Sequence, residues 1–204
     1  MQKAMNISYE IGSKLYLNIT NKCPCACTFC IRQNGDGAYG SDPLWLEHQP
    51  TVDEVIENLK TRHLDSYEEI IFCGYGEPTC ELEILKAAAE YIRSVTKTPI
   101  RLNTNGLSDL INKRETPAEF EGLVDTISIS LNASDAEAYA AVTNPGFKDV
   151  NCFEEMLSFA KRVKNYVPNV MLTVVDIIGE KEIAKSRAVA DRIGITLRVR
   201  PYES

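Results

Sequence analysis

The sequence predicts an α/β protein with a parallel sheet, and three observations support this fold class. Short apolar segments alternate with longer amphipathic segments along the chain, which is the pattern of successive β-α-β units. The 204 residues are enough for one domain with a sizeable core and too few for two ordinary domains. Since no linker or low-complexity segment divides the chain, residues 1–204 are expected to form a single domain.

Six strands and six helices account for the alternation. The predicted strands are residues 14–20, 69–73, 99–103, 126–131, 169–175 and 196–200. The predicted helices are residues 52–60, 81–94, 109–113, 135–142, 153–167 and 180–193. Thr51 followed three residues later by Glu54 has the pattern of a capping box, which sets the start of the first helix.

The number of strands bears on the architecture. A complete eight-unit barrel takes about 250 residues, so six strands favour an open, partial (β/α)6 barrel of the TIM type. A doubly wound sheet is the alternative, because periodicity alone does not separate the two. Residues 31–50 interrupt the pattern with a Gly-rich stretch and Trp45, and are interpreted either as a functional loop or as a surface Ω-loop.

Composition excludes several classes of function. The net charge of −7 argues against broad nucleic-acid binding, which needs a surplus of Lys and Arg. No apolar run approaches the roughly 20 residues of a membrane span, and the first residues lack the apolar core of a secretion signal. A cytoplasmic protein is therefore expected, with no membrane partner.

Cysteine placement is the sharpest chemical signal. Four of the seven cysteines fall between positions 23 and 30, a clustering that favours metal or cluster binding over disulfides. Cys23, Cys27 and Cys30 form a C-x3-C-x2-C triplet with no second pair, so they suit three irons of a cubane and leave the fourth iron open. Cys25 permits a rival triplet with Cys27 and Cys30. A non-catalytic zinc or thiol-binding module using all four thiols is the alternative from a different class.

Polar residues follow the predicted strands at their carboxyl ends, where parallel α/β folds place their sites. Arg198 and Arg200 lie on one side of the last strand by alternation, and either bind an anion or pair with acids elsewhere. The other segments at these strand ends are residues 74–78, 103–106, 130–132 and 177–182.

These segments together resemble the radical S-adenosylmethionine (SAM) family. The cysteine triplet follows the first strand with Phe29 before its last cysteine, and residues 74–78 (Gly-Tyr-Gly-Glu-Pro) resemble the family's Gly-Gly-Glu motif. Gly179-x-x-Glu182 resembles its fifth-strand motif, and the likeness covers essentially the whole chain. Within the family, the TatD-associated subfamily is most similar, through residues 44–46, 72–79, 101–106 and 128–133.

The resemblance implies a fold, cofactors and a reaction. The chain would be one radical SAM core domain in which Cys23, Cys27 and Cys30 bind a [4Fe–4S] cluster whose open iron chelates SAM. One electron would then cleave SAM to a 5′-deoxyadenosyl radical that abstracts hydrogen from a substrate. The residues implied in SAM binding are Gly74, Tyr75, Gly76, Glu77, Asn103, Ser130, Asn132, Ile177 and Gly179. Tyr75 departs from the motif, which has glycine there.

The substrate and partners are less closely indicated. A glycyl-radical activase-like or a nucleoside-modifying role is an alternative within the enzyme hypothesis, and no residue is assigned a catalytic role on the substrate. The resemblance implies a one-electron donor such as flavodoxin or ferredoxin. The subfamily also suggests a TatD-family nuclease as a partner.

Overall fold

The strands of the computed structural model, which describes residues 2–38 and 40–202, form one mostly parallel sheet. Within this part of the chain the sheet has seven strands in the order β1-β2-β3-β4-β5-β6-β7, and β2 to β7 are parallel. The strands are β1 Ser8–Ile11, β2 Lys14–Leu17, β3 Glu69–Phe72, β4 Ile100–Thr104, β5 Thr126–Ser130, β6 Asn169–Val175 and β7 Thr196–Arg200. The sequential order, with no reversal, is that of an open barrel and not of a doubly wound sheet.

The first strand corrects the prediction of six strands. β1 pairs antiparallel with β2 across a two-residue turn at Gly12, whose φ of +59° suits such a hairpin. The prediction missed it because four residues are too few for a clear alternation. A Gly-Ser turn between two apolar segments was the signal that could have found it.

The helices confirm the predicted order with shifts at their ends. They are α1 Val52–Lys60, α2 Leu82–Val95, α3 Ser108–Asn112, α4 Ala136–Thr143, α5 Cys152–Val163 and α6 Glu180–Arg192. Short 3-10 turns fill the connections: η1 Ile31–Gln33, η2 Leu64–Ser66, η3 Pro78–Glu81, η4 Pro117–Phe120 and η5 Asp176–Ile178. The predicted capping box of α1 is present, with Thr51 and Glu54 bonding each other's backbone N–H groups.

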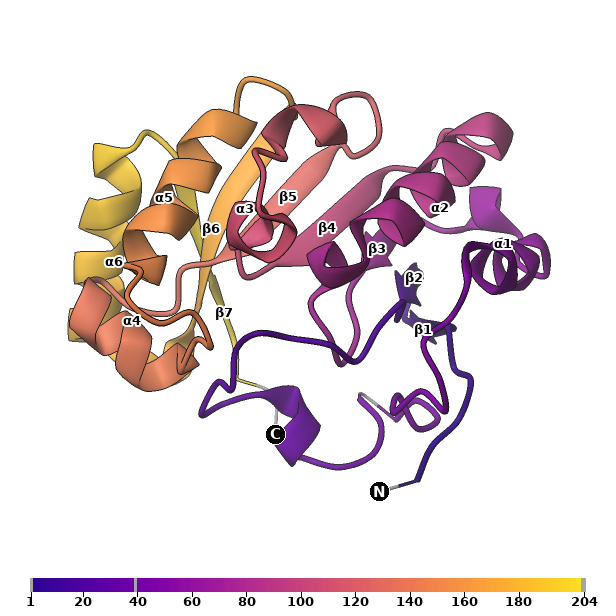
Figure 1. The fold of residues 1–204 in the computed structure, drawn as a ribbon, viewed down its shortest axis with the longest axis horizontal. Helices are drawn as coiled ribbons and strands as arrows, with labels where there is room; N and C mark the ends of the chain where they lie inside the picture. Colours follow the sequence, from indigo (N-terminus) through magenta and orange to yellow (C-terminus); the bar gives the residue numbers. More distant parts are fainter. Residues whose placement is uncertain (1, 39, 203–204) are drawn as a thin grey trace.

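The two faces of the curved sheet have different chemistry. Apolar residues of β2 to β7 such as Phe72, Leu102 and Ile129 pack under the helices and form the main core. Helices α2, α3 and α5 cover this outer face in Figure 1. Residues of the opposite, inner face alternate with these; among them are Lys14, Glu69, Cys73, Arg101, Asn103, Ser128, Ser130, Thr173, Arg198 and Arg200. The outer face is therefore apolar, whereas the inner face carries these polar residues beside a few apolar ones such as Ile71 and Met171.

The irregular segment after β2 lies below the carboxyl ends of the strands in Figure 1. Its later part builds a second, smaller core in which Ala38 and Leu44 pack with Tyr9 and Tyr75, and Trp45 contacts this group. The backbone N–H of Ala4 donates to Trp45 O at 2.8 Å. The loop is thus anchored by burial of its own side chains. In the part of the chain that the structure describes, no helix is long and apolar enough to cross a membrane.

Candidate active site

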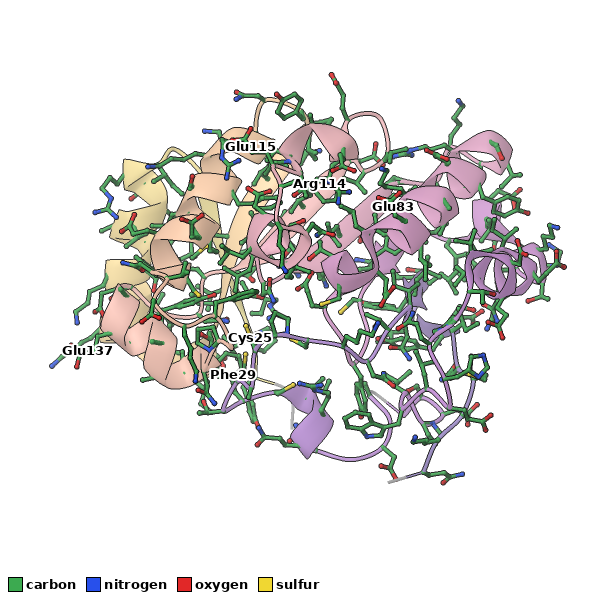
Figure 2. The ribbon with its side chains drawn as sticks, viewed as in Figure 1. Cys25, Phe29, Glu83, Arg114, Glu115 and Glu137 are labelled. Atoms are coloured by element: carbon green, nitrogen blue, oxygen red, sulfur yellow. The ribbon has the colours of Figure 1, made fainter. Side chains whose placement is uncertain are left out.

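The cysteine segment is held from outside by the end of α4. Ala26 N donates to Thr143 O at 3.0 Å, and Thr28 N donates to Val142 O at 2.9 Å. Cys25 forms an isolated antiparallel bridge with Pro145. Figure 2 shows Cys25 and Phe29 on this segment, near α4 and the carboxyl ends of the strands. The spacing of the thiols is therefore fixed by backbone contacts and not left to a free loop.

The four thiols of the segment differ in burial. Cys23, Cys27 and Cys30 are half-buried, whereas Cys25 is only 4% exposed and packs in the main core. Asn105 Nδ2 donates to Cys25 Sγ at 3.8 Å. The three residues of the predicted triplet are therefore more exposed than Cys25.

The thiols influence one another's protonation. The Cys25 thiol donates to the Cys23 sulfur and lowers the pKa of Cys23 to about 7, while this bond and burial raise the pKa of Cys25. Burial raises the pKa of Cys27 to about 12, with the charges of Cys30 and Cys23 acting in the same direction. Among the residues with a described position, no three His, Cys, Asp or Glu side chains are placed so that they could hold one metal ion together. The three thiolates of a cubane lie farther apart than three ligands of a single metal ion, because each thiolate binds its own iron.

Arg32 is a residue that the sequence analysis missed. Its Nε donates to Cys30 Sγ at 3.4 Å, and its other nitrogens donate to Asn21 O and Cys25 O at 3.4 and 3.5 Å. The guanidinium lies 5.8 Å from the ring centre of Trp45, a cation–π contact. An Arg two positions after a predicted ligand was the available signal, since a charged donor there can reach the thiolate.

Gly74 and Gly76 lie where the end of β3 approaches the start of the cysteine segment. A Cβ on Gly74 would come within 2.2 Å of Asn18 Oδ1, and a Cβ on Gly76 within 2.3 Å of Thr20 O. Tyr75 between them is buried, and its hydroxyl lies 2.9 Å from the carbonyl oxygens of both Gly35 and Gly37. The tyrosine that departs from the motif thus points into the loop core and does not obstruct the backbone approach.

Glu77 is a buried carboxylate bound by four donors. Oε1 accepts from Thr79 N, Thr79 Oγ1 and Thr104 Oγ1 at 3.0, 2.8 and 2.8 Å, and Oε2 accepts from Asn105 N at 2.7 Å. Burial raises the pKa of Glu77, and these hydrogen bonds oppose the rise. No Lys or Arg of the described residues forms an ion pair with it. One lone pair of Oε2 remains for a further donor.

A cavity of about 410 Å³ opens beside the cysteine segment, between α4 and the carboxyl ends of β5 and β6. Phe29, Asn132 and Ile177 line it, and Ile177 is 57% exposed. Asn132 adopts a left-handed φ of +63°, and its buried Oδ1 has no hydrogen-bond partner. The volume is in the range of small-molecule sites.

Glu182 supports this cavity from α6. Its Oε1 accepts from Ser134 N and Ser134 Oγ at 2.9 and 2.6 Å, which fixes the turn that carries Asn132. Gly179 precedes α6 with a φ of +80° and a ψ of 158°, a conformation open essentially to glycine only. The predicted residues Asn132 and Ile177 therefore line one cavity, and Gly179 directly follows its lining residue Ile178.

Ser130 and Asn103 lie on the inner face of the sheet. Ser130 ends β5 in register with Thr173, and Asn103 is in register with Ser128. The Oδ1 atom of Asn103 is buried without a partner. The predicted site residues are thus divided between the edge of the sheet and the interior of the barrel.

Comparison with protein families identifies the superfamily. The sequence profile of the Radical SAM superfamily matches residues 17–186, most of the chain. A GTP 3′,8-cyclase of Corynebacterium glutamicum (strain R) is 31% identical over 142 residues, which cover 66% of this chain and 34% of the cyclase. An uncharacterized protein of Methanocaldococcus jannaschii is 26% identical over 187 residues, covering 76% of this chain and 55% of that protein. The chain thus spans about a third to a half of these relatives.

Solved structures share the fold. Streptococcus suis SuiB bound to the precursor peptide SuiA has a TM-score of 0.66 and 14% identity, covering 94% of this chain and 39% of SuiB. SuiB bound to S-adenosylmethionine has a TM-score of 0.61 and 16% identity, covering 93% of this chain and 38% of SuiB. HydG, a maturase of the [FeFe]-hydrogenase, has a TM-score of 0.58 and 12% identity over 94% of this chain and 42% of HydG.

Proposed function

The chain belongs to the radical SAM superfamily, and we propose that residues 1–204 form one core domain that cleaves SAM reductively to remove hydrogen from a substrate. The superfamily uses a [4Fe–4S] cluster and SAM, so the chain is an enzyme with these cofactors. When bound, the two cofactors supply a 5′-deoxyadenosyl radical. We further propose roles for individual residues and a class of substrate.

We assign the cluster to Cys23, Cys27 and Cys30. The observation that carries the proposal is the contrast between these three half-buried thiols and the core-packed Cys25. The lowered pKa of Cys23 favours the thiolate that ligation needs. Arg32 would donate to the Cys30 thiolate and hold the loop over the cluster through Trp45.

The residues also fit SAM. Glu77 is a buried carboxylate without a cationic partner, which suits the SAM ammonium at the free lone pair of Oε2. The unpartnered Asn132 Oδ1 would accept from the ribose hydroxyls, and Ser130 would contact the methionyl carboxylate or the ribose. The backbone at Ile177 and Gly179 would line the adenine. Asn103 and the backbone of residues 74–76 complete the proposed set.

The names of two similar proteins suggest candidate classes of substrate. The cyclase relatives are named for GTP, and the SuiB structure was solved with a precursor peptide. A nucleotide-like small molecule is our first candidate, because the cyclase is the nearer sequence at 31% identity, and a peptide residue is the second. We retain the TatD-associated subfamily, a TatD-family nuclease partner and a flavodoxin or ferredoxin donor as proposals from motif resemblance.

Anaerobic reconstitution tests the function. The protein is loaded with iron and sulfide, reduced, and assayed for 5′-deoxyadenosine from SAM. We expect about four irons per chain and reductive cleavage of SAM. A colourless protein that binds one zinc and leaves SAM intact would instead establish the zinc-module alternative.

The ligand set is tested by matched alanine variants. Cys23→Ala is expected to lose the cluster, whereas Cys25→Ala is expected to keep its iron and its 5′-deoxyadenosine activity. Cys152→Ala, in buried α5, controls for the loss of any buried thiol. Loss of the cluster from Cys25→Ala together with retention in Cys23→Ala would assign the rival triplet.

A further inference from the structure

The inner face of the barrel carries more positive than negative charge. At its β2–β4 side, Arg101 donates from both Nε and Nη2 to Glu69, with Nε at 2.9 Å, and Lys14 lies 3.4 Å from the same carboxylate. Arg198 and Arg200 on β7 share the inner face, since they are in register with Thr173 and Val175. Neither makes an ion pair with any residue the structure describes.

Arg200 is the more enclosed of the two arginines. Its Nε is buried and has no hydrogen-bond partner, whereas Arg198 is exposed. The sequence had left two interpretations for this pair, an anion site or ion pairs with acids elsewhere. The absence of acidic partners among residues 2–38 and 40–202 favours the anion site.

Arg200 and Asn103 both influence the thiol of Cys73 on the inner face. Burial raises the pKa of the Cys73 thiol, while a hydrogen bond from Asn103 and the charge of Arg200 oppose that rise. In the sheet, β3 and β7 are separated by three strands, and Cys73 after β3 and Arg200 on β7 both lie on the inner face. Asn103 Oδ1 is buried and unpartnered, like Arg200 Nε. The Arg200 Nε donor and the Asn103 Oδ1 acceptor, both on the inner face, are therefore without a hydrogen-bond partner among the described residues.

A buried guanidinium Nε without a hydrogen-bond partner is costly. A buried donor without a partner forfeits its hydration, and the penalty is larger for a charged group. Such a group is retained where a ligand completes it, because stability is exchanged for function at binding sites. The planar guanidinium with paired N–H donors suits a carboxylate or phosphate group.

We propose that Arg200 binds an anionic carboxylate or phosphate group of the substrate inside the barrel. This inference rests on the proposed function. Arg200 is not among the residues that line the 410 Å³ cavity, although Tyr202 two positions later is. In the proposed function the open iron and Ser130 hold the methionine part of SAM, so the anion at Arg200 is assigned to the substrate.

Thermal unfolding of the reconstituted protein tests the site, with inorganic phosphate as the probe at constant ionic strength and saturating SAM. We expect a saturable rise of the melting temperature in wild type and in Arg187→Gln, a control on the exposed face of α6. Arg200→Met is expected to bind phosphate at least about tenfold more weakly. Without phosphate, it should melt at or above the wild-type temperature, because an unpaired charge is removed. Arg200→Lys should keep part of the response.

The outcomes separate the sources of the anion. An equal response in Arg200→Met and wild type would overturn the proposal, as would destabilisation of the phosphate-free Arg200→Met and Arg200→Lys variants by a similar amount. Phosphate binding that is seen only without SAM would assign Arg200 to the SAM carboxylate and overturn the substrate assignment. Absence of 5′-deoxyadenosine from wild type, with phosphate binding intact, would refute the proposed function and leave the anion site standing.

Discussion

The two sides of the sheet's carboxyl edge differ in how completely their polar groups are paired. On the β2–β3 side, Glu77 accepts four hydrogen bonds and the Tyr75 hydroxyl contacts two carbonyl oxygens. On the β5–β7 side, Asn132 Oδ1 and Arg200 Nε are buried without partners. On the first side the chain supplies most of the partners and leaves one lone pair of Glu77 Oε2 for a ligand, whereas on the second side buried polar atoms have no partner among the residues that the structure describes.

This difference has a physical basis. A cluster site needs fixed ligand positions, so its supporting shell is paired and packed before the metal arrives. A site for small molecules gains affinity from groups that are satisfied only in the complex. Perturbing the first side should therefore lower stability, whereas perturbing the second should lower affinity.

The largest expected effect is on the β2–β3 side. Glu77→Gln places an amide NH2 among groups that all donate, and we expect a loss of about 2–4 kcal/mol in the free energy of unfolding of the cofactor-free protein. Urea denaturation measures it, with Glu90→Gln at an exposed position of α2 as the control. A loss of unfolding free energy no larger than that of Glu90→Gln would contradict the expectation that perturbing the β2–β3 side lowers stability.

The next effect concerns the cluster. Arg32→Gln removes a charged donor from the Cys30 sulfur, and a donor stabilises the more negative, reduced state. We expect the reduction potential to fall by on the order of 50 mV, since 59 mV corresponds to about 1.4 kcal/mol for one electron. Redox titration followed by EPR measures it, with Arg187→Gln as the control. An unchanged potential would reduce Arg32 to a packing role.

A smaller effect is expected on the β5–β7 side. Asn132→Gly keeps the left-handed backbone without strain and removes the unpartnered amide. We expect the affinity for SAM to fall roughly 3- to 10-fold while the stability of the cofactor-free protein changes by less than about 1 kcal/mol. Calorimetric titration and urea denaturation give the two numbers. A loss of stability as large as that of Glu77→Gln would show that both sides are built alike.

The smallest expected effect is on the pH dependence of the unfolding free energy, compared between wild type and Glu77→Gln. The folded state raises the pKa of Glu77 above its ordinary 4.5, so it binds more protons than the unfolded state above that pH. The proton-linked part of the contribution of Glu77 to stability is therefore full below about pH 4.5 and is lost as pH rises through the folded-state pKa, whereas the part that comes from its four hydrogen bonds remains. Unfolding free energies of wild type minus those of Glu77→Gln should show this decline. A difference that rises with pH would contradict the burial of an unpaired carboxylate.

Much of the fold could be predicted from the sequence because it depends on local periodicity. The six parallel strands, the order of the helices and the Thr51 cap all come from residues close together in the chain. The antiparallel β1 was missed, since its four residues give little periodicity. Helix ends also shifted, as at Val163, where α5 ends four residues before the predicted end at residue 167.

The sequence predicted the residue types of the candidate site but not the contacts between them. The inward packing of Cys25 depends on Pro145 and Asn105, which lie far away in sequence. The four bonds to Glu77 involve Thr104 and Asn105, and the Arg32 contact with Trp45 crosses the loop. Such long-range contacts leave no spacing signal in a single sequence, so they appear only in the folded chain.

The attachment of the cysteine segment to the end of α4 has a consequence for biosynthesis. Ala26 and Thr28 bond to Thr143 and Val142, which are synthesised much later than the cysteines themselves. During translation the thiols therefore emerge long before the contacts that arrange them, and non-local contacts form slowly. Metal loading should accordingly follow the folding of the domain past α4, so a nascent chain halted before residue 142 would present its cysteines without the geometry to retain a cluster.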